Sequence, residues 1–300
     1  MIQFQPVTLR SKAWIDPIVQ AENSRSADFN FGNIYIWDKH YKQLVCRFEE
    51  RMITKLRYEG KSTFVFPIGS GPLCPAIEAA REYADFKGYP FTLRGITQEN
   101  RVLLEKEYPG GFSFSEDTVN ADYIYDIEKL STYAGKALHS KKNHCNRFEA
   151  EYSWKFMPIS RELIPYCLDM LSEWSEDNSE RLDPSIAFEH DAIIRAFAAY
   201  EDLGLFGGVL VANGSIMGFT LGELTCRDTF DVHFEKAVAT VNGAYPMVCR
   251  ELSRLVKSTY PDVLFMNRED DMGFESLRRS KESYKPEYLL KKYTARWNYD

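Results

Sequence analysis

The chain has 300 residues, of which 44% are apolar and 27% charged, and it carries 20 Phe, 18 Tyr and 5 Trp. This composition excludes a disordered chain and indicates a soluble globular protein with one large domain or two of about 150 residues. The net charge of −7 argues against a surface that binds nucleic acid throughout, and no apolar run approaches the roughly 20 residues that span a bilayer. The six widely spaced cysteines form no CxxC pair, so we expect a cytoplasmic protein with reduced thiols and no metal centre.

Charge is distributed unevenly along the chain. Residues 1–157 carry 21 basic and 20 acidic side chains, residues 158–277 carry 9 and 21, and residues 278–300 carry 7 and 3. The net charge therefore reflects one acidic segment, and it does not exclude local contact with a polyanion such as tRNA.

The first half of the chain predicts a mixed α/β sheet with covering helices. Helical spacing, strand alternation and turn residues give this order: helices at 14–23 and 33–42, strands at 44–58 and 62–67, a loop at 68–73, a helix at 75–87 that ends at Gly88, a strand at 90–96, a helix at 98–108 and a strand at 121–128.

The second half repeats this order of elements. It predicts helices at 161–176 and 186–202, strands at 206–212, 215–225 and 229–237 with a hairpin turn at Asn213-Gly214, a loop at 238–244, a helix at 245–258, a strand at 262–266, a helix from 270 to 282 and a strand at 287–297. Two copies of one order predict a tandem α/β fold. We expect an N-terminal domain at 1–155 and a C-terminal domain at 156–300 that holds the active site.

The loop before the helix at 245–258 is a candidate phosphate site. Asn242, Gly243 and Ala244 lie where a strand ends and a helix begins, and free backbone N–H groups at a helix N-terminus favour an anion. Gly243 permits a close backbone approach that a Cβ would block. Turn geometry alone explains an Asn-Gly pair equally well, so both interpretations stay open.

A carboxylate on the preceding strand is the candidate general base. Glu235 shares a strand face with His233, and a carboxylate beside apolar walls has a raised pKa and can deprotonate an ammonium nucleophile. Asn267 and Arg268 begin a charged cluster at the end of the next strand, where open α/β sheets bind ligands. Pairing with a nearby arginine would explain Glu235 without catalysis, and internal ion pairs and helix capping explain the charged cluster without a ligand.

Two stretches are candidate contacts for a phosphate-rich partner. Residues 136–147 contain four Lys or Arg and two His without an acid, and residues 278–296 are also rich in Lys and Arg. A shared face would suit tRNA, whereas a solvated bridge between domains explains residues 136–147 equally well. The sequence contains no HxxxH and no GxSxG motif, which disfavours metal and serine hydrolases.

Six stretches form a specific combination. They are Asp122-Tyr123-Ile124-Tyr125, Gly135-Lys136-x-x-His139-Ser140-Lys141-Lys142-Asn143-His144-x-x-Arg147-Phe148, His233-Phe234-Glu235-Lys236, Gly243-Ala244-Tyr245, Asn267-Arg268-Glu269-Asp270-Asp271-x-Gly273 and Leu277-Arg278-x-Ser280-Lys281-x-Ser283-Tyr284-x-Pro286. Together, over nearly the whole chain, they resemble the uncharacterised bacterial proteins grouped with the C-terminal domain of phosphatidylglycerol lysyltransferase.

This resemblance implies two tandem GNAT-type N-acyltransferase folds, related more distantly to Fem-type transferases that use aminoacyl-tRNA. It implies that the donor's phosphate or pantetheine lies beside Asn242, Gly243 and Ala244, and that Glu235 is the general base. In lysyltransferases the soluble domain transfers lysine from charged tRNA to a lipid head group.

We therefore expect an acyl or aminoacyl transferase with no permanently bound cofactor. Its donor would be a coenzyme A thioester or aminoacyl-tRNA, and its acceptor an amine or hydroxyl on a small molecule or peptide. Asn267, Arg268 and Lys281 complete the donor site, and Tyr245 or Tyr284 protonates the leaving group. A non-catalytic binding module for a small ligand or peptide is the alternative, and the sequence leaves the oligomeric state open.

Overall fold

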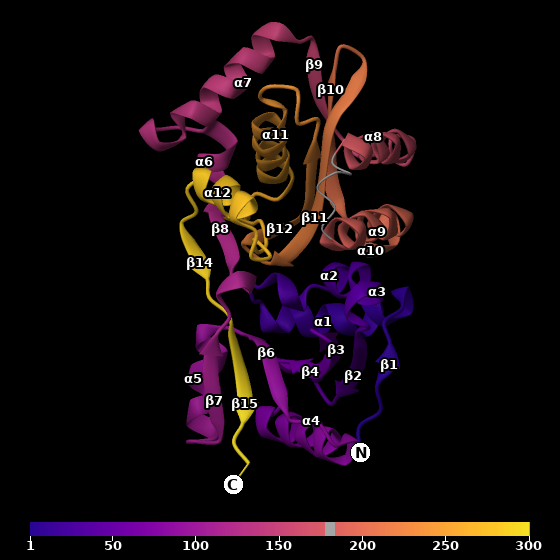
Figure 1. The fold of residues 1–300 in the computed structure, drawn as a ribbon, viewed down its shortest axis with the longest axis vertical. Coiled ribbons are helices and arrows are strands. Elements are labelled where there is room, and N and C mark those ends of the chain that lie inside the picture. The colour runs from indigo at the N-terminus through magenta and orange to yellow at the C-terminus, as the bar shows by residue number, and fades with distance from the viewer. Residues whose placement is uncertain (178–183, 300) are drawn as a thin grey trace. The chain divides into compact units, whose positions relative to one another are not determined.

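The computed structural model describes residues 1–177 and 184–299, and the chain divides into two compact units (Figure 1). The first unit comprises Met1–Asp122, Asp270–Gly273 and Leu289–Asp300, and the second comprises Tyr123–Glu269 and Phe274–Tyr288. Each unit is built around its own mixed sheet, which confirms the predicted α/β class. No helix among the described residues is long and apolar enough to cross a membrane.

The first unit contains an eight-stranded sheet in the order β1-β2-β3-β4-β6-β15-β7, with β5 paired to β3. Among the residues described, β4 and β6 pair in parallel and the other strand pairs of this sheet are antiparallel. Its elements are β1 (Gln5–Pro6), α1 (Lys12–Glu22), α2 (Phe31–Ile36), α3 (Asp38–Tyr41), β2 (Leu44–Phe48), β3 (Arg51–Tyr58), β4 (Lys61–Val65), β5 (Ile68–Gly69), α4 (Leu73–Lys87), β6 (Thr92–Ile96), α5 (Gln98–Glu107), β7 (Phe112–Glu116) and β15 (Tyr293–Trp297).

The second unit contains a seven-stranded sheet in the order β14-β8-β13-β12-β11-β10-β9, in which β12 and β13 pair in parallel. Its elements are β8 (Asp122–Asp126), α6 (Ile127–Thr132), α7 (His139–Glu151), β9 (Trp154–Pro158), α8 (Ile164–Asp177), α9 (Pro184–Ala198), α10 (Tyr200–Leu203), β10 (Phe206–Ala212), β11 (Ser215–Cys226), β12 (Thr229–Ala237), α11 (Ala244–Thr259), β13 (Phe265–Asn267), α12 (Glu275–Ser283) and β14 (Tyr288–Leu290).

Local sequence explains several of these boundaries. The turn between β10 and β11 has positive φ at Asn213 (50°) and Gly214 (84°), the backbone that a two-residue hairpin needs. Helix α4 ends at Gly88, whose φ of 73° is left-handed. In α11, Met247, Val248 and Leu252 are buried at helical spacing and form part of the core of the second unit.

The two units exchange their last strands. β8 follows the first unit in sequence but pairs with β13 of the second sheet, with Asn267 opposite Ile124. β15 ends the chain but pairs with β6 and β7 of the first sheet, where Tyr293 lies opposite Ile96 and Glu116. The compact units therefore differ from the division into 1–155 and 156–300, because strand pairing does not follow the order of elements along the chain.

Candidate functional site

The candidate site lies where two parallel strands of the second sheet separate. β12 and β13 pair from Thr229–Phe265 to Asp231–Asn267. Beyond this point β13 ends, whereas β12 continues to Ala237 in pairing with β11. After Asp231, the backbone of β12 therefore no longer pairs with β13, and the two strand ends separate.

Glu235 and Arg268 meet in this space. Arg268 Nη2 donates to Glu235 Oε1 at 2.8 Å, and the two side chains are only 11% and 10% exposed. Burial raises the pKa of Glu235, against the opposing charges of Arg268, Lys281 and Lys141. The structure thus contains the arginine pairing that was expected as the non-catalytic alternative for Glu235.

Arg268 retains one N–H donor that the described part of the chain does not use. Its Nη1 atom is buried and has no hydrogen-bond partner among the described residues. The guanidinium lies 4.5 Å from the ring centroid of Tyr284 and 5.5 Å from that of Tyr125, so aromatic rings hold it in place. A buried, unsatisfied guanidinium N–H is costly, and an anion or carbonyl oxygen of a ligand would satisfy it.

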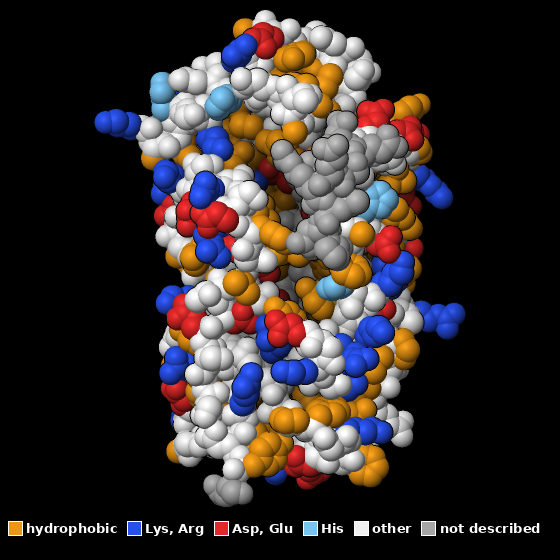
Figure 2. Space-filling view, viewed as in Figure 1, with side chains coloured by type: hydrophobic (Ala, Val, Ile, Leu, Met, Phe, Trp, Pro, Cys, Tyr) orange, Lys and Arg blue, Asp and Glu red, His pale blue; other side chains and the backbone are white. Residues whose placement is uncertain are grey.

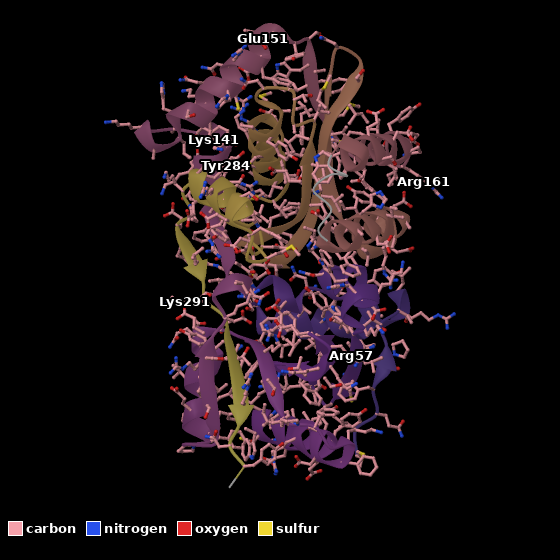
Figure 3. All side chains as sticks on the ribbon, in the orientation of Figure 1. Arg57, Lys141, Glu151, Arg161, Tyr284 and Lys291 are labelled. Atoms are coloured by element: carbon pink, nitrogen blue, oxygen red, sulfur yellow. The ribbon has the colours of Figure 1, made fainter. Side chains whose placement is uncertain are left out.

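Two lysines and Tyr284 complete the surroundings of this pair. Lys281 Nζ donates to the backbone oxygen of Arg268, and Lys141 Nζ lies 3.8 Å from the ring centroid of Tyr284. Figure 3 shows Lys141 on α7 beside Tyr284 at the end of α12. Burial lowers the pKa of Lys141, with a further contribution from Arg268, and raises that of Tyr284 well above its usual value. Tyr284 therefore keeps its phenol proton at neutral pH.

Tyr245 stands in the first turn of α11 and contacts a helix that covers the sheet. Its hydroxyl accepts a hydrogen bond from Trp174 Nε1 at 3.3 Å, and burial raises its pKa. The ring of Trp174 also lies 3.9 Å from Lys236 Nζ, which donates to Glu189 at 2.7 Å. Lys236 thus contacts α8 and α9, whereas Glu235 contacts the end of β13.

The loop with Asn242, Gly243 and Ala244 packs against α7. Asn242 Oδ1 lies 2.7 Å from His144 Nδ1, and a Cβ on Gly243 would lie 2.5 Å from the backbone oxygen of His144. Gly243 has a φ of 88°, and Ala244 is fully buried. Packing against α7 therefore explains the need for glycine, and the donor-binding role of these three residues remains a prediction.

Asn267 supports the bend that carries Arg268. It is fully buried, and its Oδ1 accepts a hydrogen bond from the backbone N–H of Glu269 at 2.7 Å. The following Asp270 and Asp271 accept from backbone N–H groups two residues ahead, at 2.9 Å each, as the capping interpretation expects. Asn267 thus positions the bend, and a direct contact with a donor remains a prediction.

The predicted basic stretch at 136–147 forms helix α7 and the short turn before it. α7 carries Lys142 and His139 exposed on its surface, and Lys136 is exposed in the turn before it. Figure 2 shows lysine, arginine and histidine side chains over this part of the molecule. Lys141 of α7 and Tyr284 after α12 are in contact, so the basic stretches at 136–147 and 278–296 approach each other there.

Two features of this region were not predicted from the sequence, the contact made by Tyr125 and the surroundings of His233. Tyr125 Oη donates to the backbone oxygen of Lys281 at 2.8 Å, and this bond holds the Tyr125 ring beside the guanidinium of Arg268. His233 lies among carboxylates, next to a register shift opposite Gly222. A glycine inside a strand signals such a bulge, and Gly222 was the available sign.

Comparisons with known proteins agree with this architecture. The chain is 34% identical to a conserved Bacteroides thetaiotaomicron protein of unknown function, with a TM-score of 0.94 over 99% of this chain and 100% of that one. It shares the fold of L-PGS from Bacillus licheniformis (18% identity, TM-score 0.72, 100% and 95% covered) and of FemX (9%, 0.64, 98% and 97%).

An uncharacterised protein of Mycoplasmoides gallisepticum is 28% identical over 180 residues, which are 59% of this chain. The match spans 56% of that protein's length. The family model described as "Phosphatidylglycerol lysyltransferase, C-terminal" matches residues 20–296. The tandem α/β fold and the family resemblance seen in the sequence are thus confirmed, and the chain belongs to the family of phosphatidylglycerol lysyltransferase C-terminal domains.

Proposed function

We propose that this chain transfers an aminoacyl group from aminoacyl-tRNA to an amine or hydroxyl acceptor at the Glu235–Arg268 site. The observation that carries this proposal is the unused, buried Nη1 donor of Arg268 beside a buried carboxylate. The family name of a lysyltransferase and the fold shared with L-PGS and FemX support a transferase of this class.

In the proposed reaction, Glu235 accepts a proton and Arg268 stabilises the negative charge that forms. The acceptor nitrogen or oxygen forms a bond to the acyl carbon, the ester bond to the tRNA ribose breaks, and the acceptor's proton passes to Glu235 Oε2. Glu235 Oε1 stays bound to Arg268, while Arg268 Nη1 donates to the oxygen that becomes negative as the acceptor attacks. The ribose oxygen leaves with a proton from Tyr284 or Tyr245.

The surroundings favour aminoacyl-tRNA over a coenzyme A thioester as donor. The loop at Asn242 and Gly243 is packed on His144, so its glycine serves that contact. The exposed Lys136 and Lys142 offer positive charge for a phosphate backbone. Lys141 of the same stretch contacts the ring of Tyr284 at the candidate site. A coenzyme A thioester is the second donor, and a small molecule or peptide is the acceptor we expect.

A binding module without turnover is the competing function, and one observation favours it. Glu235 is already neutralised by Arg268 at 2.8 Å, and a carboxylate held in an ion pair is a weaker base. In that case Arg268 Nη1 would hold a ligand's carboxylate or phosphate without chemistry.

A transfer assay separates the two functions. The full chain is incubated with radiolabelled aminoacyl-tRNA and a mixture of amine acceptors, and labelled product is measured. Glu235→Gln should lower the rate by about 10²–10⁴-fold, the usual contribution of a general base. Glu251→Gln is the matched control, because Glu251 is 11% exposed and also paired with an arginine, Arg250 at 2.8 Å.

Equal loss in both variants, or full activity of Glu235→Gln, would refute the assigned base. Saturable tRNA or acetyl-coenzyme A binding without any product would support the binding module.

A further inference from the structure

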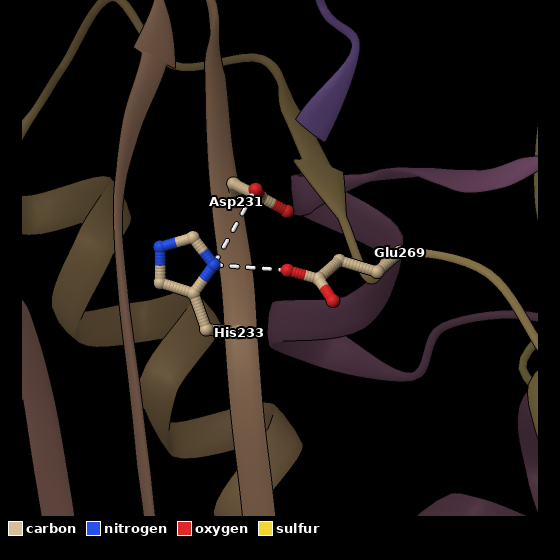
Figure 4. A group of neighbouring side chains, drawn as sticks. All are labelled: Asp231, His233 and Glu269. Carbon is tan, nitrogen blue, oxygen red and sulfur yellow. Dashed lines mark hydrogen bonds and ion pairs between the residues drawn. The ribbon is translucent and has the colours of Figure 1, made fainter. Parts of the chain in front are cut away.

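A second cluster of ionisable side chains surrounds His233 (Figure 4). His233 Nδ1 lies 2.9 Å from Glu269 Oε1 and 3.6 Å from Asp231 Oδ2, and its Nε2 lies 3.1 Å from Glu223 Oε1. The imidazole and the Asp231 side chain are fully buried, whereas Glu269 is 20% exposed. Three carboxylates thus surround one imidazole.

The strand geometry brings these groups together. β12 pairs with β11 with a register shift between Leu221 and Gly222, so that Val232 lies opposite Gly222 while Phe234 lies opposite Leu221. His233 is the extra residue of this bulge, and bulges re-aim side chains. A Cβ on Gly222 would lie 1.8 Å from the backbone oxygen of Asp231, so glycine is required for this arrangement.

The distances match those of a metal site with one nitrogen and two oxygen ligands. The ligand atoms of Asp231, His233 and Glu269 lie within 4.8 Å of one another. A tetrahedral zinc ion bound at about 2.0–2.2 Å separates neighbouring ligand atoms by about 3.3 Å, between the 2.9 and 3.6 Å found at His233 Nδ1.

The second nitrogen of the same imidazole has the partner that metal-bound histidines use. A metal on Nδ1 requires a lone pair there, which places the proton on Nε2, where Glu223 accepts it. Carboxylates that accept from a ligating histidine fix its tautomer and orientation. Glu223 therefore suits a supporting role behind His233, while the partly exposed Glu269 leaves an approach for the ion.

We propose that Asp231, His233 Nδ1 and Glu269 bind one divalent transition-metal ion of the zinc type, with Glu223 orienting His233. This site is separate from the proposed transfer chemistry. It would fix the turn after β13, because Glu269 directly follows Arg268, and so it would position the arginine without contacting the substrate. The sequence had indicated no metal centre, because Asp231 and His233 lie on β12 whereas Glu269 lies in the turn after β13, far along the chain and without a metal-binding spacing.

The test uses the full chain, stripped with a chelator and then titrated with Zn²⁺ alone by calorimetry, with Co²⁺ absorption as a second readout. One ion per chain should bind, and binding should raise the melting temperature. Glu269→Gln should weaken Zn²⁺ binding at least tenfold, and Glu223→Gln should weaken it about 10–100-fold through the orientation of His233. His139→Gln on the exposed surface of α7 is the control and should bind as the parent chain does.

Glu269 is the partly exposed ligand, so its replacement by Gln is the variant that retains the fold most readily. The melting temperature without metal checks this. Absence of Zn²⁺ and Co²⁺ binding in the parent chain would overturn the proposal and leave His233 as an imidazolium that donates to Glu223 and Glu269. Stoichiometric binding that survives Glu269→Gln and Asp231→Asn would also overturn it. The transfer assay does not enter this test, so either proposal can fail alone.

Discussion

Replacing Lys292 by methionine should destabilise the first unit, because it removes the cation that two carboxylates share. Lys292 precedes β15 and is 2% exposed, with Nζ 2.7 Å from Asp122 Oδ1 and 3.0 Å from Asp28 Oδ2. Asp122 is 1% exposed, and its Oδ2 accepts from the backbone N–H of Ala27 at 3.0 Å. Lys292 therefore links three segments of the first unit, those of Asp28, Asp122 and its own position before β15.

The expected loss follows from the burial of this pair. Removing one partner of a buried ion pair costs about 3–5 kcal/mol, because the other charge stays buried without compensation. At roughly 2–4 °C per kcal/mol for a unit of this size, the melting temperature of the first unit should fall by roughly 10 °C. Differential scanning calorimetry at pH 7 measures this shift, and urea unfolding followed by circular dichroism provides a second value.

The neighbouring lysine is the matched control. Lys291 is 56% exposed and pairs with Glu116 at 3.1 Å on the surface, so Lys291→Met should leave the melting temperature nearly unchanged (Figure 3). Adding Asp122→Asn to Lys292→Met should recover most of the loss, since both buried charges are then gone and only the carboxylate of Asp28, which is 35% exposed, remains. Equal melting temperatures for Lys292→Met and Lys291→Met would refute this reasoning.

The deficit of Lys292→Met should also depend on pH. Burial raises the pKa of Asp122 even with Lys292 present, and the unfolded carboxyl titrates near its ordinary value. A raised folded pKa in an acid means that its carboxylate destabilises the fold above that pKa. Without Lys292, this penalty should therefore shrink as the pH falls and Asp122 takes up a proton.

Three further predictions concern the second unit. Gly243→Ala should lower the urea midpoint more than Gly214→Ala. Both positions have positive φ, which costs about 1–2 kcal/mol, but only the Cβ at Gly243 meets a backbone atom, at 2.5 Å. Tyr245→Phe should cost about 1 kcal/mol and change the fluorescence of Trp174, whose N–H loses its acceptor; unchanged emission would contradict this contact. If Glu235 is the base, the transfer rate should decline as the pH falls below its raised pKa, and a transfer rate that stays unchanged on acidification past the ordinary range of glutamate would exclude it.

Local chemistry made part of the fold predictable. The expected helix at 245–258 is α11, because its apolar positions repeat at helical spacing. The hairpin at Asn213-Gly214 follows from a pair that tolerates positive φ. The stretch 287–297 was expected as one strand, yet it forms β14 and β15, which join different sheets. Strand alternation is the same in either sheet, so the sequence pattern does not reveal the exchange.

The residues of the Glu235–Arg268 contact were named from the sequence, but the contact between them was not predicted. Glu235 and Arg268 were both expected to be functional, and their contact depends on the parallel register of β12 and β13, which is non-local. For Gly243, a close backbone approach was predicted. The group that approaches it, the backbone carbonyl of His144, was not. The His233 cluster depends on the bulge in β12 and on Glu269, which follows the end of β13, so no local sequence motif predicts it.

A crystal structure with a non-hydrolysable aminoacyl-adenosine analogue tests the central proposal most directly. The acyl oxygen of the analogue should lie about 2.7–3.2 Å from Arg268 Nη1, with its carbonyl carbon on the side of Glu235. An analogue bound elsewhere in the second unit, with Nη1 of Arg268 still lacking a partner, would contradict the proposed site.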